Sequence, residues 1–319
     1  MKLFFRLLAG VFVVFTCSSW GFFAHRRINH VAIFTLPGAM AGFYENHIDF
    51  ITAHAVDADK RRYVDSLEAP RHFLDADHYG RSPFGKIPQN WYDAVKKYSV
   101  DTLNKYGTVP WVIQYHYYWL VKAFKAHDTT AILKTSANLG HYIADAYVPL
   151  HLTVNYDGQL SGQTGIHALW ESRLPELFSN RYNYYVGKAR YIENPLTEAF
   201  RICRTSFACV DSVLRFEKKL SRVFPKNKKY EIVLRGRRRV TEYSAAYSAA
   251  YHRMLNGMVA RRMRGAILTI GSFWYSAWID AGQPDLNKLI DTPDTPTRRQ
   301  QLRHEEALYK AGKVLVLGN

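Results

Sequence analysis

The sequence predicts an all-α, multi-helix single domain that carries a small β-hairpin insertion. Apolar residues recur at three-and-four spacing over 91–135, 136–150, 195–222 and 241–280. Hydrophobic residues make up 48% of the chain and charged residues 22%, which provides enough apolar material for a core and excludes a disordered or low-complexity protein. Only Tyr230 to Tyr243 is typical of a strand pair, with Arg235-Gly236 at its turn.

The first residues are typical of a secretory signal rather than of the fold. Lys2 and Arg6 precede a short apolar run over 7–15, and small residues follow. This run is well short of the roughly 20 residues that a membrane-spanning helix needs. We therefore expect residues 1–19 to be a signal peptide, the protein to be exported to a periplasm or the medium, and Trp20 to begin the mature chain.

The domain itself is expected to cover 20–292. Its longest apolar run, Ala266 to Ile279, contains one threonine and two serines and predicts a buried helix rather than a membrane span. The charged segment 293–319 is expected to form a tail that leaves the core. Cys203 and Cys209 either form a disulfide, which export permits, or remain free thiols.

Positive charge is concentrated in one segment. The chain has a net charge of +16, and eleven Lys or Arg with two Glu lie between Arg215 and Arg239, a local net charge of +9. Such a segment attracts phosphate-rich surfaces, either lipid headgroups or nucleic acid. The alternative is a solvated loop that maintains solubility.

Two histidine–carboxylate pairs are the strongest chemical signal. His141 and Asp145 are four residues apart, so on a helix they share a face, and His167 and Glu171 repeat that spacing. Pro149 should end the first helix, which leaves His151 free to serve a neighbouring ion. Imidazole and carboxylate are ordinary zinc ligands. The alternative interpretation is that these are isolated core histidines. Two such pairs within about thirty residues make that alternative less favoured.

Further candidates lie upstream. The segment before residue 80 adds carboxylates and one imidazole: Asp57, Asp59, His72, Asp75 and Asp77. His25 follows Trp20 by five residues, and a freed Trp20 amine, with a pKa near ~8, can chelate a metal together with its own carbonyl.

Taken in order, these residues resemble the superfamily of bacterial zinc-dependent phospholipase C and fungal single-strand-specific zinc nucleases. The resemblance spans roughly Trp20 to Leu174, and His141-x3-Asp145-x5-His151 is its most specific part. It implies an all-α fold around three zinc ions. One zinc would be bound by Asp57, His72, His141 and Asp145; a second by Trp20, His25 and the bridging Asp145; the third by His151, His167 and Glu171. Asp59 remains the alternative to Asp57.

The resemblance also implies a reaction. Zinc lowers the pKa of bound water to about 7, so a hydroxide can attack a phosphodiester at neutral pH. Asp145 would bridge two ions, and Asp57 would accept a proton from the attacking water. Lys60 or Arg62 would contact a phosphate oxygen; the alternative is that both are solvated. Phe73 and Asp75 sit where the nucleases bind a base, although the phospholipases carry a similar segment.

The branch of the superfamily is left open by the motifs. Trp20-x4-His25 and the Trp before Glu171 resemble the nucleases, whereas Glu171 itself and the absence of an Asp-x-Gly-Gly-Asn loop match the phospholipases. We therefore expect a phospholipase C-like enzyme acting on phospholipid headgroups, with a nuclease as the alternative. A third class is a metal-stabilised protein that binds anionic surfaces without turnover.

Overall fold

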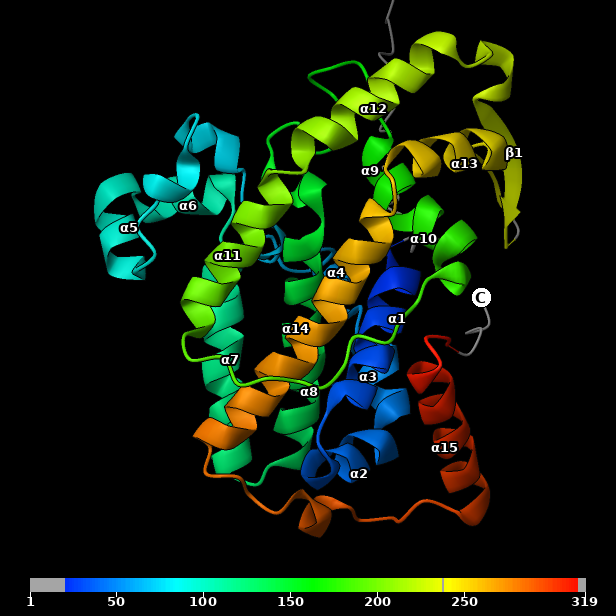
Figure 1. The fold of residues 1–319 in the computed structure, drawn as a ribbon. Coiled ribbons are helices and arrows are strands. Elements are labelled where there is room, and N and C mark those ends of the chain that lie inside the picture. Colours follow the sequence, from blue (N-terminus) through cyan, green and yellow to red (C-terminus); the bar gives the residue numbers. More distant parts are fainter. Residues whose placement is uncertain (1–20, 237, 315–319) are drawn as a thin grey trace, which may run out of the picture.

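The computed structural model describes residues 21–236 and 238–314. Residues 1–19, expected to be a signal peptide, and Trp20 lie outside this range. Within it the regular structure is helical apart from one antiparallel hairpin, which confirms the predicted all-α class (Figure 1). The helices are α1 Phe22–Ala32, α2 Gly38–Asn46, α3 Ile48–His54, α4 Asp57–Arg61, α5 Trp91–Tyr98, α6 Val100–Tyr106, α7 Val109–Lys125, α8 Thr129–Tyr147, α9 Ile166–Ala168, α10 Leu174–Phe178, α11 Pro195–Phe207, α12 Val210–Val223, α13 Ala245–Met254, α14 Met258–Asp280 and α15 Pro296–Lys310.

Shorter helical turns connect these helices. The 3-10 turns are Ile33–Thr35, Ala69–His72, Ala76–Tyr79, Pro83–Gly85, Pro149–Leu152, Ser179–Arg181, Lys226–Lys228 and Leu286–Leu289, and Leu169–Arg173 is a π-helical turn. The hairpin strands are β1 Tyr230–Arg235 and β2 Arg238–Tyr243, with Tyr230 opposite Tyr243 and Arg235 opposite Arg238. The predicted hairpin is thus confirmed, and Arg235, expected at its turn, is the last residue of β1.

Helix α8 is the central element of the core. Asp128 begins it by accepting a hydrogen bond from the Ala131 N–H at 2.9 Å, and the chain becomes extended at Val148, just before Pro149. From Leu139 to Tyr147 every residue is buried, because α1, α3, α7, α11 and α14 all pack around it. The metal-ligand candidates on α8 therefore lie inside the bundle.

Helices α1 and α8 approach each other closely at one glycine. A methyl group on Gly140 would lie 2.0 Å from Asn29 Oδ1, so only glycine fits there. The Asn29 amide donates to the His25 carbonyl at 3.1 Å. This contact brings the two helices that carry His25 and His141 side by side.

The long apolar segment from Ala266 to Ile279 lies within α14, and most of it is buried, as predicted. No helix in the described part of the chain combines the length and the apolar character needed to cross a membrane.

The end of the chain differs from the expected tail. Residues Pro296–Lys310 form α15, in which Leu302, Glu305 and Tyr309 are buried. His30 Nε2 on α1 lies 2.6 Å from Glu305 Oε2, which attaches α15 to the domain (Figure 1). The expectation that this segment leaves the core is therefore wrong for α15, because its apolar and acidic positions recur on one helical face.

The two cysteines of the described residues, Cys203 and Cys209, are free thiols. Cys203 is buried on α11, and Cys209 donates its thiol hydrogen to the Thr205 carbonyl. Of the two alternatives for this pair, the structure has the unpaired one.

Candidate metal centre

The centre begins with His141 and Asp145, one helical turn apart on α8. Both are buried, and His141 Nε2 lies 3.3 Å from Asp145 Oδ2. His141 Nδ1 donates to the Ala55 carbonyl at 2.8 Å. Because a carbonyl only accepts, this bond fixes the tautomer and leaves Nε2 facing the cluster as a ligand atom.

A first group of four ligand atoms includes Asp145 Oδ2. His72 Nδ1 lies 2.9 Å from this oxygen and 3.1 Å from His141 Nε2. Asp59 Oδ1 lies 3.8 Å from each of the two ring nitrogens. Ligand atoms about 2.0–2.1 Å from a tetrahedral zinc are separated by about 3.3 Å. The four side chains are thus spaced as the ligands of one cation are.

Asp59, and not the expected Asp57, is the α4 carboxylate that faces the first group, so the preference for Asp57 as its ligand is wrong. The Asp57 carboxylate contacts His54 Nδ1 at 2.5 Å and Lys60 Nζ at 2.9 Å. Burial opposes its ionisation, but these two partners outweigh burial and lower its pKa. Both aspartates are on α4, where two residues correspond to about 200° of rotation, so only one of them can face His72.

A second group forms on the other oxygen of Asp145. His25 Nε2 on α1 lies 3.3 Å from Asp145 Oδ1, and its ring stacks on His141 at 4.1 Å between centroids. Gly21, the first described residue, lies against both His25 and Glu171. The remaining predicted ligand of this group, Trp20, lies outside the described residues.

The third group combines His151, His167 and Glu171. Glu171 Oε2 lies 3.4 Å from His151 Nε2 and 2.7 Å from His167 Nε2, and the other Glu171 oxygen lies 3.2 Å from His25. The chain after Pro149 turns so that His151 Nδ1 donates to the His72 carbonyl at 2.6 Å. Glu171 belongs to the π-helical turn, a form that often occurs at functional sites.

The charges of the centre explain why a cation fits it. Burial opposes ionisation of Asp145 and Glu171, but the surrounding histidines outweigh burial and hold both pKa values well below their usual range. Burial likewise opposes protonation of His151, yet Asp145 and Glu171 raise its pKa to about 9. Buried carboxylates need positive partners, and a divalent ion can replace the imidazole protons in that role. The described residues therefore include three sets of side chains that could hold metal ions, with His141 shared by two of them: His25, His141 and Asp145; Asp59, His72 and His141; and His151, His167 and Glu171.

A buried carboxylate behind His72 was missed by the sequence analysis. Glu68 lies 3.5 Å from His72 Nε2, on the side of the ring away from the cluster. Glu68 also accepts from Arg71 at 2.7 Å, from Arg61 at 3.2 Å and from the Tyr142 hydroxyl. Glu68 and His72 are four residues apart, so the acid–histidine spacing that identified the other pairs could have found this one.

The residues predicted to contact substrate have different surroundings in the structure. Lys60 is paired with Asp57, whereas an Arg62 nitrogen lies 3.8 Å from Asp59 Oδ1, next to the first group. Phe73 is half-buried, and its backbone carbonyl accepts from the Val109 N–H at 3.1 Å. Burial, together with the nearby Asp77, raises the pKa of Asp75 to about 7, against the opposing effect of His151.

Asp77 holds the loop that follows His151. It accepts from the Thr153 hydroxyl at 2.6 Å and from the Val154 N–H at 3.0 Å. This side chain therefore positions the chain between His151 and His167, two members of the third group.

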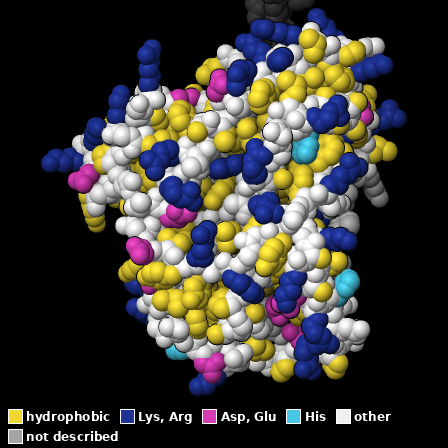
Figure 2. Space-filling view, in the orientation of Figure 1, with side chains coloured by type: hydrophobic (Ala, Val, Ile, Leu, Met, Phe, Trp, Pro, Cys, Tyr) yellow, Lys and Arg dark blue, Asp and Glu magenta, His cyan; other side chains and the backbone are white. Residues whose placement is uncertain are grey.

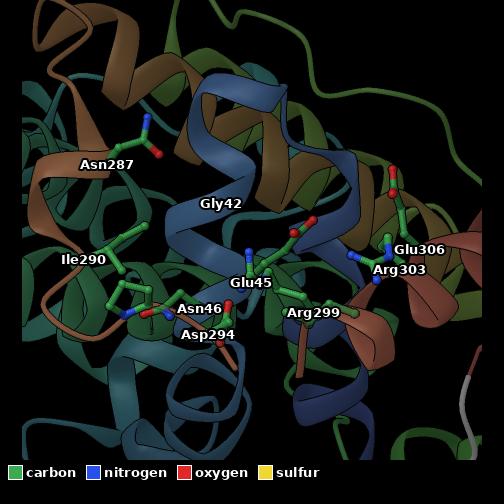
Figure 3. A pocket seen from close by; sticks show the side chains of 11 residues that line it. Gly42, Glu45, Asn46, Asn287, Ile290, Asp294, Arg299, Arg303 and Glu306 are labelled. Atoms are coloured by element: carbon green, nitrogen blue, oxygen red, sulfur yellow. The ribbon is translucent and has the colours of Figure 1, made fainter. Parts of the chain in front are cut away.

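A separate cavity of about 430 Å³ lies between α2 and α15. Figure 3 shows Glu45, Asp294 and Glu306 there together with Arg299 and Arg303. None of the residues that line it is a histidine or cysteine. This cavity is distinct from the metal centre.

No known protein family model matches this chain, and comparison with curated proteins found no match.

Proposed function

We propose that this protein is an exported, zinc-dependent phosphodiesterase that acts on phospholipid headgroups in the manner of a phospholipase C. The observation that carries the proposal is the position of Asp145, whose two oxygens face two different histidine groups. A carboxylate placed in this way suits two cations held a short distance apart, an arrangement used for in-line displacement at phosphorus.

Zinc ions bound by these groups would supply a hydroxide at neutral pH and neutralise charge on a phosphate. The chain's own residues would do the rest. Asp59 is 22% exposed, more than His72, His141 or Asp145, so it is the carboxylate best placed to accept a proton from a water at the site. Arg62, next to it, is placed to contact a phosphate oxygen.

Export belongs to the proposal because the resemblance implies Trp20 as a ligand of the second group beside His25 and Asp145. Removal of residues 1–19 would give Trp20 a free amine next to Gly21, which lies against His25 and Glu171. A chain that starts at Trp20 should bind three zinc ions. A chain with an extra residue before Trp20 should bind fewer, as measured by metal analysis.

The test is a substrate panel on the zinc-loaded chain that starts at Trp20. We expect hydrolysis of a chromogenic phosphocholine ester, with loss of turnover in His141→Ala and on chelation of zinc. Faster cleavage of single-stranded DNA than of the ester would favour the nuclease alternative. Turnover of neither at full zinc occupancy would contradict catalysis and leave a binding protein.

A further inference from the structure

The hairpin exposes a row of apolar side chains. Alternate residues of β1 point away from the domain, and Tyr230, Ile232 and Leu234 are 46%, 69% and 71% exposed. Val223, at the end of α12, is 77% exposed. Exposed aliphatic side chains that gather in one segment often mark a binding surface.

Basic side chains flank this row. Arg215, Lys218, Lys219 and Arg222 recur at three-and-four spacing on the outer face of α12, and all are exposed. Lys226, Lys228 and Arg239 continue the exposed basic surface, with Arg239 directly opposite Leu234 in the hairpin. Figure 2 shows dark blue Lys and Arg side chains along the upper and right-hand margins of the molecule, where α12 and the hairpin lie, with hydrophobic side chains between them.

Not all positive charge of this segment is available. Lys229 pairs with the buried Glu217 at 3.0 Å, and Arg235 pairs with Glu176 at 2.5 Å. These two bases hold the segment onto the domain. Arg215 pairs with the exposed Asp211 at 3.2 Å, so Lys218, Lys219 and Arg222 are the bases of α12 left to face a partner.

We propose that this surface, made of Val223, Ile232, Leu234 and the exposed bases around them, docks on an anionic phospholipid bilayer. Aliphatic tips enter the boundary between headgroups and acyl chains, while Lys and Arg stems extend toward the phosphates. Single-stranded nucleic acid is held instead by aromatic stacking along a basic groove. The one aromatic side chain of this row, Tyr230, packs against Tyr243 at 4.9 Å between ring centroids, and Val223, Ile232 and Leu234 provide no stacking.

The docking surface is joined directly to the metal centre. Arg173 lies in the same π-helical turn as Glu171, and it contacts Glu231 on β1 at 2.6 Å and Glu242 on β2 at 3.0 Å. The Arg173 side chain also donates to the Tyr243 carbonyl at 3.3 Å. Docking would hold the third group close to the lipid surface, a catalytic consequence that rests on the proposed function and favours its phospholipid form.

The experiment is co-sedimentation with phosphatidylcholine vesicles that contain or lack phosphatidylserine. The wild-type chain should bind the anionic vesicles and largely fail to bind the neutral ones. The double variant Ile232→Ser/Leu234→Ser should bind anionic vesicles about tenfold more weakly, because two apolar side chains no longer enter the lipid. A charge variant, Lys218→Glu/Lys219→Glu/Arg222→Glu, should lose binding at low salt.

The matched control is Tyr92→Ser/Val100→Ser. It removes exposed apolar side chains from α5 and α6, which lie on the opposite side of the molecule from the hairpin in Figure 1. This variant should bind vesicles as the wild type does.

Two results would overturn the docking surface. One is vesicle binding by Ile232→Ser/Leu234→Ser equal to that of the wild type. The other is wild-type binding to a single-stranded oligonucleotide without binding to anionic vesicles. Turnover of a soluble phosphocholine ester, measured on the same samples, reports the proposed function separately, since a protein can dock without turnover or turn over without docking.

Discussion

Asp145 and Asp59 determine how the first two groups of the centre are arranged. Asp145 is buried between His25 on one side and His72 with His141 on the other. Asp59 completes the first group from the more exposed side. The two aspartates of α4 therefore have different roles, and this difference can be measured.

We expect Asp59→Asn to lose one bound zinc and most of the turnover, because a carboxylate ligand is replaced by a neutral amide. Asp57→Asn is the matched control on the same helix. It should keep its zinc, because the Asp57 carboxylate pairs with His54 and Lys60 and not with the first group. Zinc per chain, measured after dialysis, separates the two variants. The reverse pattern would restore Asp57 as the ligand.

Glu68 should tune the affinity of the first group. Glu68→Gln removes the carboxylate that faces His72 Nε2, and loss of such a partner typically weakens metal binding by about 10–100-fold. Glu305→Gln is the control, because Glu305 is equally a buried acid but contacts His30, which is not a ligand candidate. Competition with a zinc chelator gives both affinities. An equal loss in the two variants would indicate a general loss of stability instead.

The residue-level prediction from sequence succeeded where spacing alone defines a face. His141 with Asp145, and His167 with Glu171, meet because four residues make about one helical turn. Spacing could not choose between Asp57 and Asp59, since that choice depends on how α4 is rotated against α8. The rotation is set by tertiary packing, which a single sequence does not display.

Among the elements, the hairpin shows how a peripheral insertion is held in place. Arg173 is 9% exposed and contacts two glutamates and a backbone carbonyl of the hairpin. The ion pair with Glu242 is buried, so loss of one partner should be costly.

Arg173→Met should therefore lower the free energy of unfolding by about 3 kcal/mol. Arg235, which lies 3.1 Å from Glu242, would remain as a positive partner of that glutamate. Arg201→Met is the control, because Arg201 pairs with Glu198 on the surface and should contribute less than about 1 kcal/mol. Urea unfolding at fixed zinc concentration measures both. Equal losses in the two variants would show that the buried ion pair contributes no more to stability than the surface pair.

Element boundaries were harder to predict than element types. The helical pattern over 91–135 is divided in the structure by Ser99, with φ +69°, and by Gly107, with φ +90°. Serine gives little warning of a left-handed conformation, so the break between α5 and α6 could not be read from the pattern. The hairpin was predicted because alternation and an Arg-Gly turn are local signals.

At the scale of the whole molecule, α15 is attached to α1 and borders the cavity that separates it from α2. His30 and Glu305 meet across 275 positions of sequence, so local patterns could not predict this contact. The cavity beside α15 collects three carboxylates, and burial, followed by the charge of Glu306, raises the pKa of Glu45 (Figure 3).

Glu45→Gln should accordingly stabilise the protein at neutral pH. A raised pKa means that the folded state holds the proton of the Glu45 carboxyl more readily than the unfolded chain does. The wild type therefore loses part of its free energy of unfolding as pH rises above about 4.3, the pKa of a glutamate in the unfolded chain. The advantage of the variant should be absent below about pH 4, grow as pH rises through the folded pKa, and then stay constant. Thermal unfolding across this range measures it. A pH-independent difference would show that ionisation of Glu45 does not oppose folding.

The glycine at position 140 links the interior of the bundle to its chemistry. Even a single added methyl would collide with Asn29 and push α1 away from its neighbour, carrying His25 off the ring of His141. The smallest side chain in the protein thereby governs whether imidazoles from two separate helices can reach a common ion, and a screen for lost activity should find it as readily as the ligands themselves.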